Sequence, residues 1–484
     1  MKSHRLALIA TLILVSMPLF ATQTPQTVVI EGVREAKDCA YNFTSFYYLP
    51  FDVPAGVMKL TIERQMATEP GGNVGLGTFL FDSRGIAFPY NGFRGVREFG
   101  SDPIVISGDK ATTTRQFYPG PIPSGRWNIA QHFRWKGKDV QRVTYKYTIT
   151  FSFDSPKTDT MPNILYDPAI NAKPGWYAVD LHDHTIHSDG QGTLDEVAAF
   201  HASSGYDAMN NTDHNITTAQ LDFPEVGAKY PSMLFLAGEE VSTFNGHANV
   251  IGAKPGDWYD PRMIPDDGRL PKLLEKVHRE GALFSINHPS SGRFSWTFPA
   301  KEWENVDAIE VWNGGWFGGD DRQAADLWDS LLKAGRHITG VGGTDVHAKA
   351  GNLTDFCWVW ADNLSRQAIV DGIRKGRVFI SYQKTGPLPY LSVPGTSALP
   401  GDTVRIGKQD SVPVQIRVVG GKDMSLRLVW QDGETKIPID RTFARIEYSV
   451  PVSPALMKSY VRVEVQRADG VVFALTNPIY IERD

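Results

Sequence analysis

The sequence has little cysteine and no concentrated basic segment. Cys39 and Cys357 are the two cysteines of the 484 residues, and neither lies in a metal-ligand spacing. Lysine and arginine are spread along the chain and the formal net charge is −5, which argues against a nucleic-acid partner because phosphates require a basic face. A G-x-S-x-G motif and a reactive-cysteine context are also missing, so we expect no side-chain nucleophile.

Long apolar runs are absent after the first 21 residues. Lys2 and Arg5 precede an apolar stretch over residues 6–20, and Leu19-Phe20-Ala21 fits a cleavage site. Residues 1–21 are therefore predicted to be a signal peptide, with a retained membrane anchor as the alternative and no stable membrane span after cleavage. The protein is expected to be exported, either periplasmic or secreted. Export would permit a disulfide, but nothing requires one, and we expect two unpaired thiols.

The length suits about two to four domains, and a hydrophobic content of 42% indicates a globular protein. Residues 22–155 form short alternating runs divided by turn signals, which is typical of a β-sandwich. Residues 156–175, with regularly spaced prolines, are predicted to be a linker. Alternation returns over residues 387–484 and predicts a second β-sandwich.

Between these β-rich regions, residues 176–386 alternate strand-like and helix-like segments. This alternation predicts a parallel sheet with crossover helices. Thr193 and Glu196 form a capping box, and Gly205 is expected to end the first helix. Helices are expected over residues 193–203, 270–280 and 321–334.

Metal-binding side chains repeatedly follow the predicted strands. His182 and His184 are two residues apart, so they point to the same side of an extended strand, and a Ser-Asp-Gly turn returns Asp189 towards them. Imidazole and carboxylate are ligands of zinc, manganese and iron. Because the carboxyl ends of barrel strands converge, one site is expected to collect nine donors: His182, His184, Asp189, His214, Glu239, His247, His288, Asp345 and His347.

Nine donors exceed the needs of one tetrahedral ion, so we expect two or three divalent ions, Mn, Zn or Fe, that share carboxylate bridges. The alternative is a set of independent polar residues at strand ends. Structural or surface roles are expected for four other histidines, namely His187, His201, His278 and His337.

The motifs H-D-H-T-I-H-S-D-G, N-T-D-H-N, G-E-E-V, N-H-P and G-G-T-D-V-H resemble, in this order, those of the PHP (polymerase and histidinol phosphatase) superfamily. The resemblance covers residues 176–387 and implies a distorted (βα)7 barrel. The expected fold class is therefore a multidomain α/β plus all-β protein, in which this barrel is flanked by N-terminal and C-terminal β-sandwiches. The resemblance also implies a bi- or trinuclear metal site in which Glu239 bridges two ions.

One element departs from the family pattern. Many relatives place a ligand histidine directly before a V-x-G strand end, where this chain has Asn249, and His247 lies two residues earlier. The exported β-domain, the tail A-L-T-N-P-I-Y-I and the G-H-A-N motif resemble the secreted carbaryl-hydrolase-like (CehA/McbA) branch, which favours His247. The rival amidohydrolase (βα)8 barrel also opens with H-x-H, but the D-V-H and T-D-H motifs favour PHP.

The expected function is an exported metal-dependent hydrolase that uses a metal-bound hydroxide on a small-molecule ester, with phosphate esters favoured. A carboxylic or carbamate ester hydrolase, a non-catalytic metal-dependent binding protein and an exported carbohydrate-binding protein are the alternatives. His247 or His347 is a candidate proton donor to the leaving group. Arg293 is a candidate anion clamp or a surface ion pair. Nearby aromatics would suit a flat apolar substrate or form a core patch: Phe294, Trp296, Trp312, Trp316 and Phe317. The sequence leaves the oligomeric state open.

Overall fold

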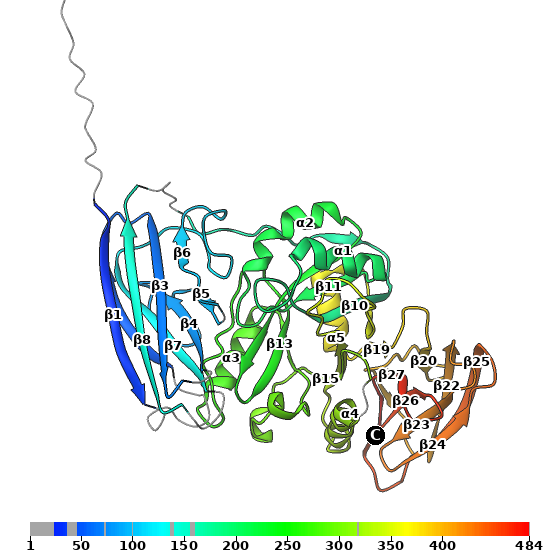
Figure 1. Ribbon diagram of the computed structural model, residues 1–484. Helices are drawn as coiled ribbons and strands as arrows, with labels where there is room; N and C mark the ends of the chain where they lie inside the picture. Colours follow the sequence, from blue (N-terminus) through cyan, green and yellow to red (C-terminus); the bar gives the residue numbers. More distant parts are fainter. Residues whose placement is uncertain are drawn as a thin grey trace, which may run out of the picture.

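The structure is a computed structural model that describes residues 24–35, 46–71, 74–98, 100–135, 140–154, 160–316 and 319–483. Two β-rich parts flank a central part that carries the helices (Figure 1). The predicted signal peptide, Cys39 and Phe317 lie outside the described residues, and Cys357 is a buried free thiol. Among the helices of the described ranges, none has the length and apolarity that a membrane crossing requires.

The N-terminal part consists of two four-stranded antiparallel sheets. Alternate residues of its strands are buried, as in β8, where Tyr147 and Ile149 are buried and Lys146 is exposed. This period-two burial is the pattern from which the sequence predicts a sandwich. One sheet contains β1 (Gln26–Glu35), β8 (Arg142–Ser152), β3 (Lys59–Glu69) and β6 (Ile104–Ser107), and the other β2 (Tyr47–Val53), β7 (Gly125–Trp135), β4 (Val74–Phe81) and β5 (Phe93–Arg97).

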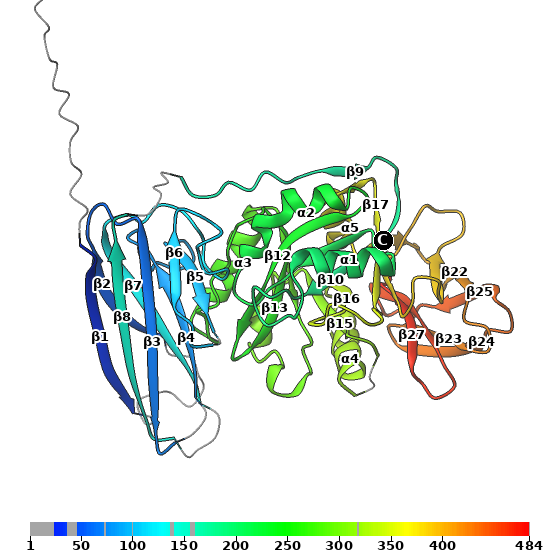
Figure 2. The same cartoon turned by 45° about the horizontal axis from the view of Figure 1, so that its top comes forward.

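The segment predicted as a linker is partly built into the central part. Strand β9 (Ala169–Asn171) pairs with β18 (Leu364–Ser365). Figure 2 shows the segment that leads to β9 passing beside α2. The ring of Tyr166 packs 5.5 Å from Phe223 and 6.0 Å from Phe235. The described residues 160–175 are therefore anchored by a strand pair and by aromatic packing.

The central sheet is mixed and not wholly parallel. Strands β10 to β12 are parallel, as are β14 to β16, but β13 is antiparallel to both of its neighbours. Strands β12 and β13 are joined directly by a short turn, which leaves no room for the dozen or more residues of a parallel crossover. The strands are β10 (Gly175–Asp183), β11 (Ala208–Asn211), β12 (Leu234–Thr243), β13 (Gly246–Ala253), β14 (Leu283–Ile286), β15 (Ala308–Asn313) and β16 (Thr339–Gly343).

The described strands do not form the expected closed (βα)7 barrel. The free edge of β10 is taken by the antiparallel strand β17 (Phe356–Ala361), which pairs in turn with β19 (Val378–Ser381). The chain after β16 still returns to the end of β10, because Asp345 N donates to His182 O at 2.8 Å and His184 N donates to Val346 O at 3.0 Å. The sheet thus curls enough to bring the first and last predicted ligand motifs together.

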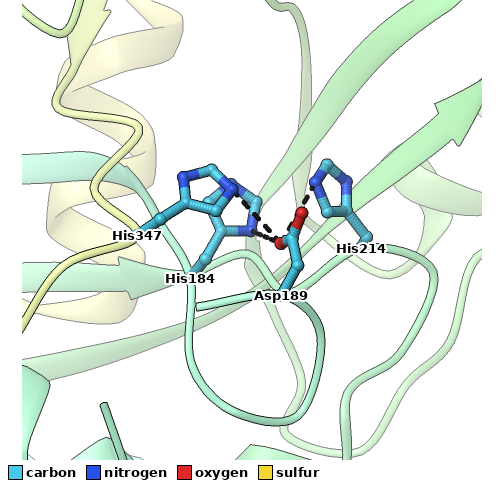
Figure 3. Close-up of side chains that lie close together, drawn as sticks. All are labelled: His184, Asp189, His214 and His347. Atoms are coloured by element: carbon cyan, nitrogen blue, oxygen red, sulfur yellow. Dashed lines mark ion pairs between the residues drawn. The ribbon is translucent and has the colours of Figure 1, made fainter. Parts of the chain in front are cut away.

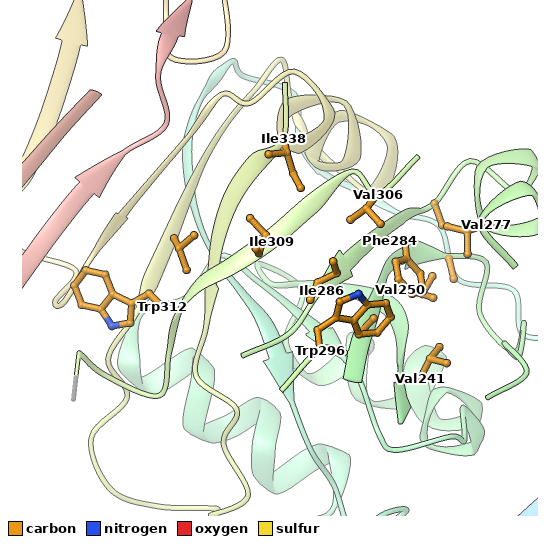
Figure 4. Close-up of a cluster of buried hydrophobic side chains, with 14 of the residues drawn as sticks. Val241, Val250, Val277, Phe284, Ile286, Trp296, Val306, Ile309, Trp312 and Ile338 are labelled. Atoms are coloured by element: carbon orange, nitrogen blue, oxygen red, sulfur yellow. The ribbon is translucent and has the colours of Figure 1, made fainter. Parts of the chain in front are cut away.

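The expected helices are present, and the start of the first is capped as predicted. The side chain of Thr193 accepts from the backbone of Glu196 in a capping box, and Gly205 ends the helix at φ 91°. Figure 4 shows part of the buried core, in which Trp296 and Trp312 pack among aliphatic side chains. The helices are α1 (Leu194–Ser204), α2 (Phe223–Lys229), α3 (Arg269–Arg279), α4 (Gly319–Lys333) and α5 (Arg366–Arg374).

The C-terminal part has two facing sets of strands around its own apolar core. Its strand β27 pairs antiparallel with β19 of the central part, so one hydrogen-bonded sheet runs across the boundary predicted at residues 386–387. One set is β20 (Leu388–Ser392), β22 (Ser411–Val419) and β25 (Phe443–Pro451). The other is β27 (Val472–Thr476), β26 (Lys458–Gln466), β23 (Ser425–Trp430) and β24 (Gly433–Pro438), with β28 (Ile479–Glu482) and β21 (Thr403–Arg405) at one side.

Candidate metal centre

Eight of the nine predicted ligands lie in one connected cluster, together with a carboxylate that was not predicted. Each imidazole is within 4.0 Å of a carboxylate oxygen of Asp189, Glu240 or Asp345. The structure thus brings together His182, His184, Asp189, His214, His247, His288, Asp345 and His347 from segments far apart in the sequence.

Glu240 on β12 is the centre of the cluster, and its side chain is 1% exposed. Its Oε1 lies 3.0 Å from His247 Nδ1, 3.3 Å from His288 Nε2 and 3.4 Å from His182 Nε2. Its Oε2 lies 2.7 Å from His214 Nδ1 and 3.6 Å from His184 Nε2. A carboxylate with each oxygen facing a different set of imidazoles has the arrangement that a bridge between two ions requires.

Glu239 does not lie among these imidazoles, so its predicted place in the cluster is wrong by one residue. Its Oε2 accepts a hydrogen bond from Tyr259 N at 2.7 Å, and burial raises the pKa of its carboxyl well above the usual range. The β12–β13 pairing contains a register shift between Ala237 and Glu239. This bulge changes which residue of the G-E-E-V motif points to the site, because successive strand residues face opposite sides.

Asp189 forms a second centre with three imidazoles (Figure 3). Its Oδ1 lies 3.2 Å from His347 Nε2, 3.5 Å from His214 Nε2 and 4.0 Å from His184 Nδ1. His184 and His214 therefore stand between the Glu240 centre and the Asp189 centre, with one ring nitrogen towards each. Around these two centres, the side chains that could hold an ion form three overlapping groups, namely His184–Asp189–His214–His347, His182–His184–Asp345 and His214–Glu240–His247.

Glu310 on β15 orients two of the histidines, a role that the sequence analysis missed. Its Oε1 lies 3.0 Å from His182 Nδ1, and its Oε2 accepts from His288 N at 2.8 Å and from Asn313 Nδ2 at 3.0 Å. Histidine ligands commonly donate their second ring N–H to such a carboxylate. The available signal was an acidic residue inside an otherwise apolar strand.

Asp180 also supports this site through hydrogen bonds, a role that the sequence patterns did not predict. Its Oδ1 accepts from His182 N at 3.1 Å and from Thr344 N at 3.0 Å. Its Oδ2 lies 2.8 Å from His201 Nε2, while His201 Nδ1 donates to Val197 O. This buried carboxylate thereby joins the strand of the first motif to the segment that carries Asp345, and His201 has the structural role expected for it.

Two cluster residues have a left-handed backbone that side chains rarely adopt. The φ angle is 26° at His288 and 49° at Asp345. Such conformations cost about 1–3 kcal/mol each and persist when neighbouring contacts impose them. Here His288 N is held by Glu310 Oε2, and Asp345 N is held by His182 O. This strain aims both side chains into the cluster.

The proton positions fit bound cations. His347 Nδ1 lies 2.9 Å from Asp345 O, and a carbonyl oxygen can only accept, so Nδ1 carries the proton. The other ring nitrogen, His347 Nε2, faces Asp189 Oδ1 at 3.2 Å, so a proton or an ion would lie between them. His182 is arranged likewise, because Glu310 holds its Nδ1 and its buried Nε2 has no hydrogen-bond partner. Lone pairs that converge on carboxylates require a positive charge between them.

The electrostatics of the cluster agree with this requirement. Burial lowers the pKa of His214, but Glu240 raises it more, to about 9. Burial raises the pKa of the Glu240 carboxyl, but the surrounding imidazoles lower it more, to well below its usual range. Burial likewise raises the pKa of the Asp345 carboxyl, but the neighbouring His182 and His184 lower it more, so that it is also well below the usual range. The ionised carboxylates and the imidazoles with raised pKa are thus charge partners, and a divalent ion that binds would displace the imidazole protons and take over their charge.

The geometry distinguishes the two candidates on β13. His247 Nδ1 is 3.0 Å from Glu240 Oε1. Asn249 is the cross-strand partner of Glu240, but its buried amide donates to Leu181 O at 3.0 Å. Of the two candidates, His247 is therefore the one whose side chain contacts the Glu240 carboxylate.

Of the aromatics named from the sequence, Phe294 lies beside the cluster. It is 40% exposed, and its ring centroid lies 5.3 Å from that of His247 and 6.2 Å from that of His288. Trp296, Trp312 and Trp316 are buried in the core. The exposed guanidinium of Arg293 lies 4.6 Å from the Phe294 ring centroid, at the rim of the site.

A cavity of about 320 Å³ adjoins the cluster. Polar side chains and two small residues line it, namely His288, Ser290, Ser291, Glu310, Asn313, Asp320 and Asp321 together with Gly319 and Ala324. Such a lining suits a polar ligand that can donate hydrogen bonds.

No family model and no curated protein sequence matches the chain. Among solved structures, it is similar to a two-domain protein from Bacteroides vulgatus that contains a predicted PHP-like metal-dependent phosphoesterase, with 16% identity over 67% of this chain and 99% of that chain and a TM-score of 0.38. It is also similar to an amidohydrolase from Chromobacterium violaceum, with 17% identity over 36% of this chain and 89% of that one and a TM-score of 0.28.

A proposed metal-dependent phosphoesterase from Bifidobacterium adolescentis shares 14% identity over 42% of this chain and 96% of its own, with a TM-score of 0.30. These TM-scores are too low to assign a fold or a function.

Proposed function

We propose that this protein is a metal-dependent hydrolase of the PHP type that acts on a small-molecule ester, in the first place a phosphate ester. The carrying observation is the buried Glu240 carboxylate, whose two oxygens face five imidazoles between Asp189 and Asp345. His182, His247, His288 and Asp345 would hold one ion with Glu240, and Asp189, His214 and His347 would hold the other, with His184 between them. Bound divalent ions supply a hydroxide nucleophile at neutral pH and polarise the ester oxygen.

The residues of the chain would contribute binding, orientation and a proton. Arg293 stands at the rim with its charge exposed, where it would attract an anionic ester. His247 is 13% exposed, and its ring lies beside Phe294 on the accessible side. Because an imidazole bound to an ion is a poor acid, proton transfer to the leaving group would fall to whichever of His247 and His347 does not bind an ion, with His247 as our first candidate. The polar cavity beside His288 would hold the leaving group.

A carboxylic or carbamate ester is the second candidate substrate. The partly exposed ring of Phe294 beside His247 and His288 supports this candidate, because it offers a flat apolar contact at the site. The signal-like residues 1–21 support the further proposal that the enzyme is exported. The G-H-A-N motif at His247 supports a place in the carbaryl-hydrolase-like branch.

Two adjacent substitutions test the proposal. Glu240→Gln should lower the hydrolysis rate at least about 100-fold, because it removes the bridging charge. Glu239→Gln is the matched control and should keep the rate within about threefold, because a protonated carboxyl and an amide are nearly isosteric. The assay compares p-nitrophenyl phosphate, bis-p-nitrophenyl phosphate and naphthyl carbamate with added manganese or zinc. No metal-dependent hydrolysis of any of them, or a loss in Glu239→Gln alone, would refute the proposal.

A further inference from the structure

The N-terminal sandwich contacts the central part close to His214, one of the residues of the Asp189 centre. The ring of Phe93 stacks on Trp258 with centroids 3.7 Å apart and planes 6° apart, and the hydroxyls of Tyr118 and Thr217 are hydrogen-bonded. Trp258 Nε1 in turn donates to Asn215 O at 2.9 Å. The segment next to His214 therefore lies between the sandwich and the central sheet and is in contact with both.

A chain of hydrogen bonds leads from the sandwich to His214. Glu98 Oε1 accepts from Asn215 Nδ2 at 3.2 Å, and Asn215 Oδ1 accepts from Ser242 N at 2.8 Å. Ser242 Oγ lies 2.6 Å from His214 Nδ1. Asn215 has φ 55°, a left-handed conformation that asparagine tolerates better than most residues. Its side chain is thus fixed at both ends, by Glu98 and by Ser242.

A second contact leads from the sandwich to the loop that carries Asp189. His187 Nδ1 donates to Arg115 O at 3.1 Å and lies 2.9 Å from Thr218 Oγ1. His187 is 9% exposed, two residues before Asp189. Because a carbonyl only accepts, the proton of His187 sits on Nδ1 and points at the sandwich.

The Glu240 centre is supported differently. The orienting contacts of His182, His288 and Asp345 come from Glu310, Asn313 and the backbone of β10, all within the central part. Both sandwich contacts therefore lead to ligands of the Asp189 centre, namely Asp189 and His214, of which His214 also faces Glu240 through its Nδ1 at 2.7 Å.

We propose that the N-terminal sandwich is a positioning element for one of the two metal-binding centres, through Glu98–Asn215–Ser242 to His214 and through Arg115–His187 to Asp189. This inference rests on the proposed function, because it requires that the Asp189 centre binds metal. The expected consequence is that loss of a sandwich contact weakens the ion at the Asp189 centre much more than the ion at the Glu240 centre, which has other ligands held within the central part. Glu98 and His187 are positioning residues and touch neither substrate nor ion.

The test is a zinc titration of the metal-free full chain by competition with a chelating dye. Glu98→Ala should weaken one class of zinc sites about 10- to 100-fold, the usual effect of removing an outer support, and leave the other within about threefold. Glu98→Gln keeps an amide oxygen that accepts from Asn215, so it should behave like the wild type. Tyr48→Phe is the matched control, because it removes another contact across the same boundary, the 2.7 Å hydrogen bond from Arg262, whose guanidinium is otherwise bonded to Asp260 and Ile86 O.

The outcomes separate this inference from the function on which it rests. A wild type with two zinc classes, neither of which shifts in Glu98→Ala, refutes the positioning role and leaves the function standing. An equal loss in both classes with a lowered melting temperature also refutes it, because that pattern is general destabilisation. A wild type that binds no zinc refutes both.

Discussion

The two β-rich parts are joined to the central part in different ways. The N-terminal sandwich meets it through side chains, and the contacts of Glu98 and His187 lead to His214 and Asp189. The C-terminal part continues the central sheet through the β19–β27 ladder. It adds a buried ion cluster with α4, in which Arg462 Nη2 lies 2.6 Å from Asp329 Oδ2.

Two β-rich parts of similar architecture thus contribute differently to the protein. The N-terminal part contacts residues next to the candidate metal centre, and the C-terminal part is joined to the central sheet. Glu464 accepts from Arg462 at 2.8 Å, and Arg322 of α4 lies 3.2 Å from it. The hydrogen bonds of Arg462, Arg322 and Arg427 in this ion cluster end on Asp329, Glu434 and Glu464, none of which belongs to the candidate metal centre. We therefore expect the C-terminal boundary to control stability and the N-terminal boundary to control metal affinity.

The largest expected effect on stability follows from Arg462→Met. The side chain of Arg462 is fully buried, so its loss leaves Asp329 buried without its partner. Breaking a buried pair in this way costs about 3–5 kcal/mol. Urea unfolding of the metal-free protein measures this change, and zinc affinity should stay within about threefold of the wild type.

The control for this variant is Arg441→Met, which removes an exposed pair with Asp440 and should leave the urea midpoint unchanged. A large loss of zinc affinity in folded Arg462→Met would break the proposed division between the two boundaries. So would an unchanged stability, because the ion cluster would then not hold the C-terminal part in place.

A smaller effect concerns the pH dependence of the same boundary. Burial raises the pKa of Glu464, but Arg462, Arg322 and Arg427 lower it more, so the net pKa is well below the usual range. A depressed folded-state pKa gives stability that is fully present above the unfolded value of about 4.3 and is lost as pH falls through the folded value.

The stability difference between wild type and Glu464→Gln should therefore be constant above about pH 5 and shrink on acidification. Urea unfolding of both metal-free proteins over this range measures it, and protonation of the metal ligands cancels because both proteins share them. A difference that grows as the pH falls would contradict the assigned sign.

The sequence patterns predict most of the donor set because short motifs tie ligands to strand ends. His182 and His184 are fixed by the period of a strand, and Asp189 by the turn after it. The choice between Glu239 and Glu240 depends on a bulge opposite β13, which the spacing of G-E-E-V does not reveal. Asp180 and Glu310 were missed because their roles arise from partners far away in the sequence.

The fold, like the donor set, could be predicted where it depends on residues that are close in the sequence, and not where it depends on distant ones. The capping box of α1 is local, and the structure has it as predicted. The antiparallel strand β13 and the β19–β27 ladder depend on which edges meet in space, and the alternation of strands and helices does not encode that. The alternation predicts a parallel sheet with crossover helices, and the (βα)7 barrel was implied by the resemblance to the PHP superfamily.

The number of metal ions bound per chain is the decisive test of whether the cluster of histidines and carboxylates is a metal centre. We predict at least two equivalents of manganese, zinc or iron per chain by elemental analysis of the purified protein after reconstitution, and a lower stoichiometry in Glu240→Gln with that of Glu239→Gln unchanged. Fewer than one equivalent in the wild type would contradict the account, because the converging carboxylates and imidazoles would then have to be balanced by protons alone.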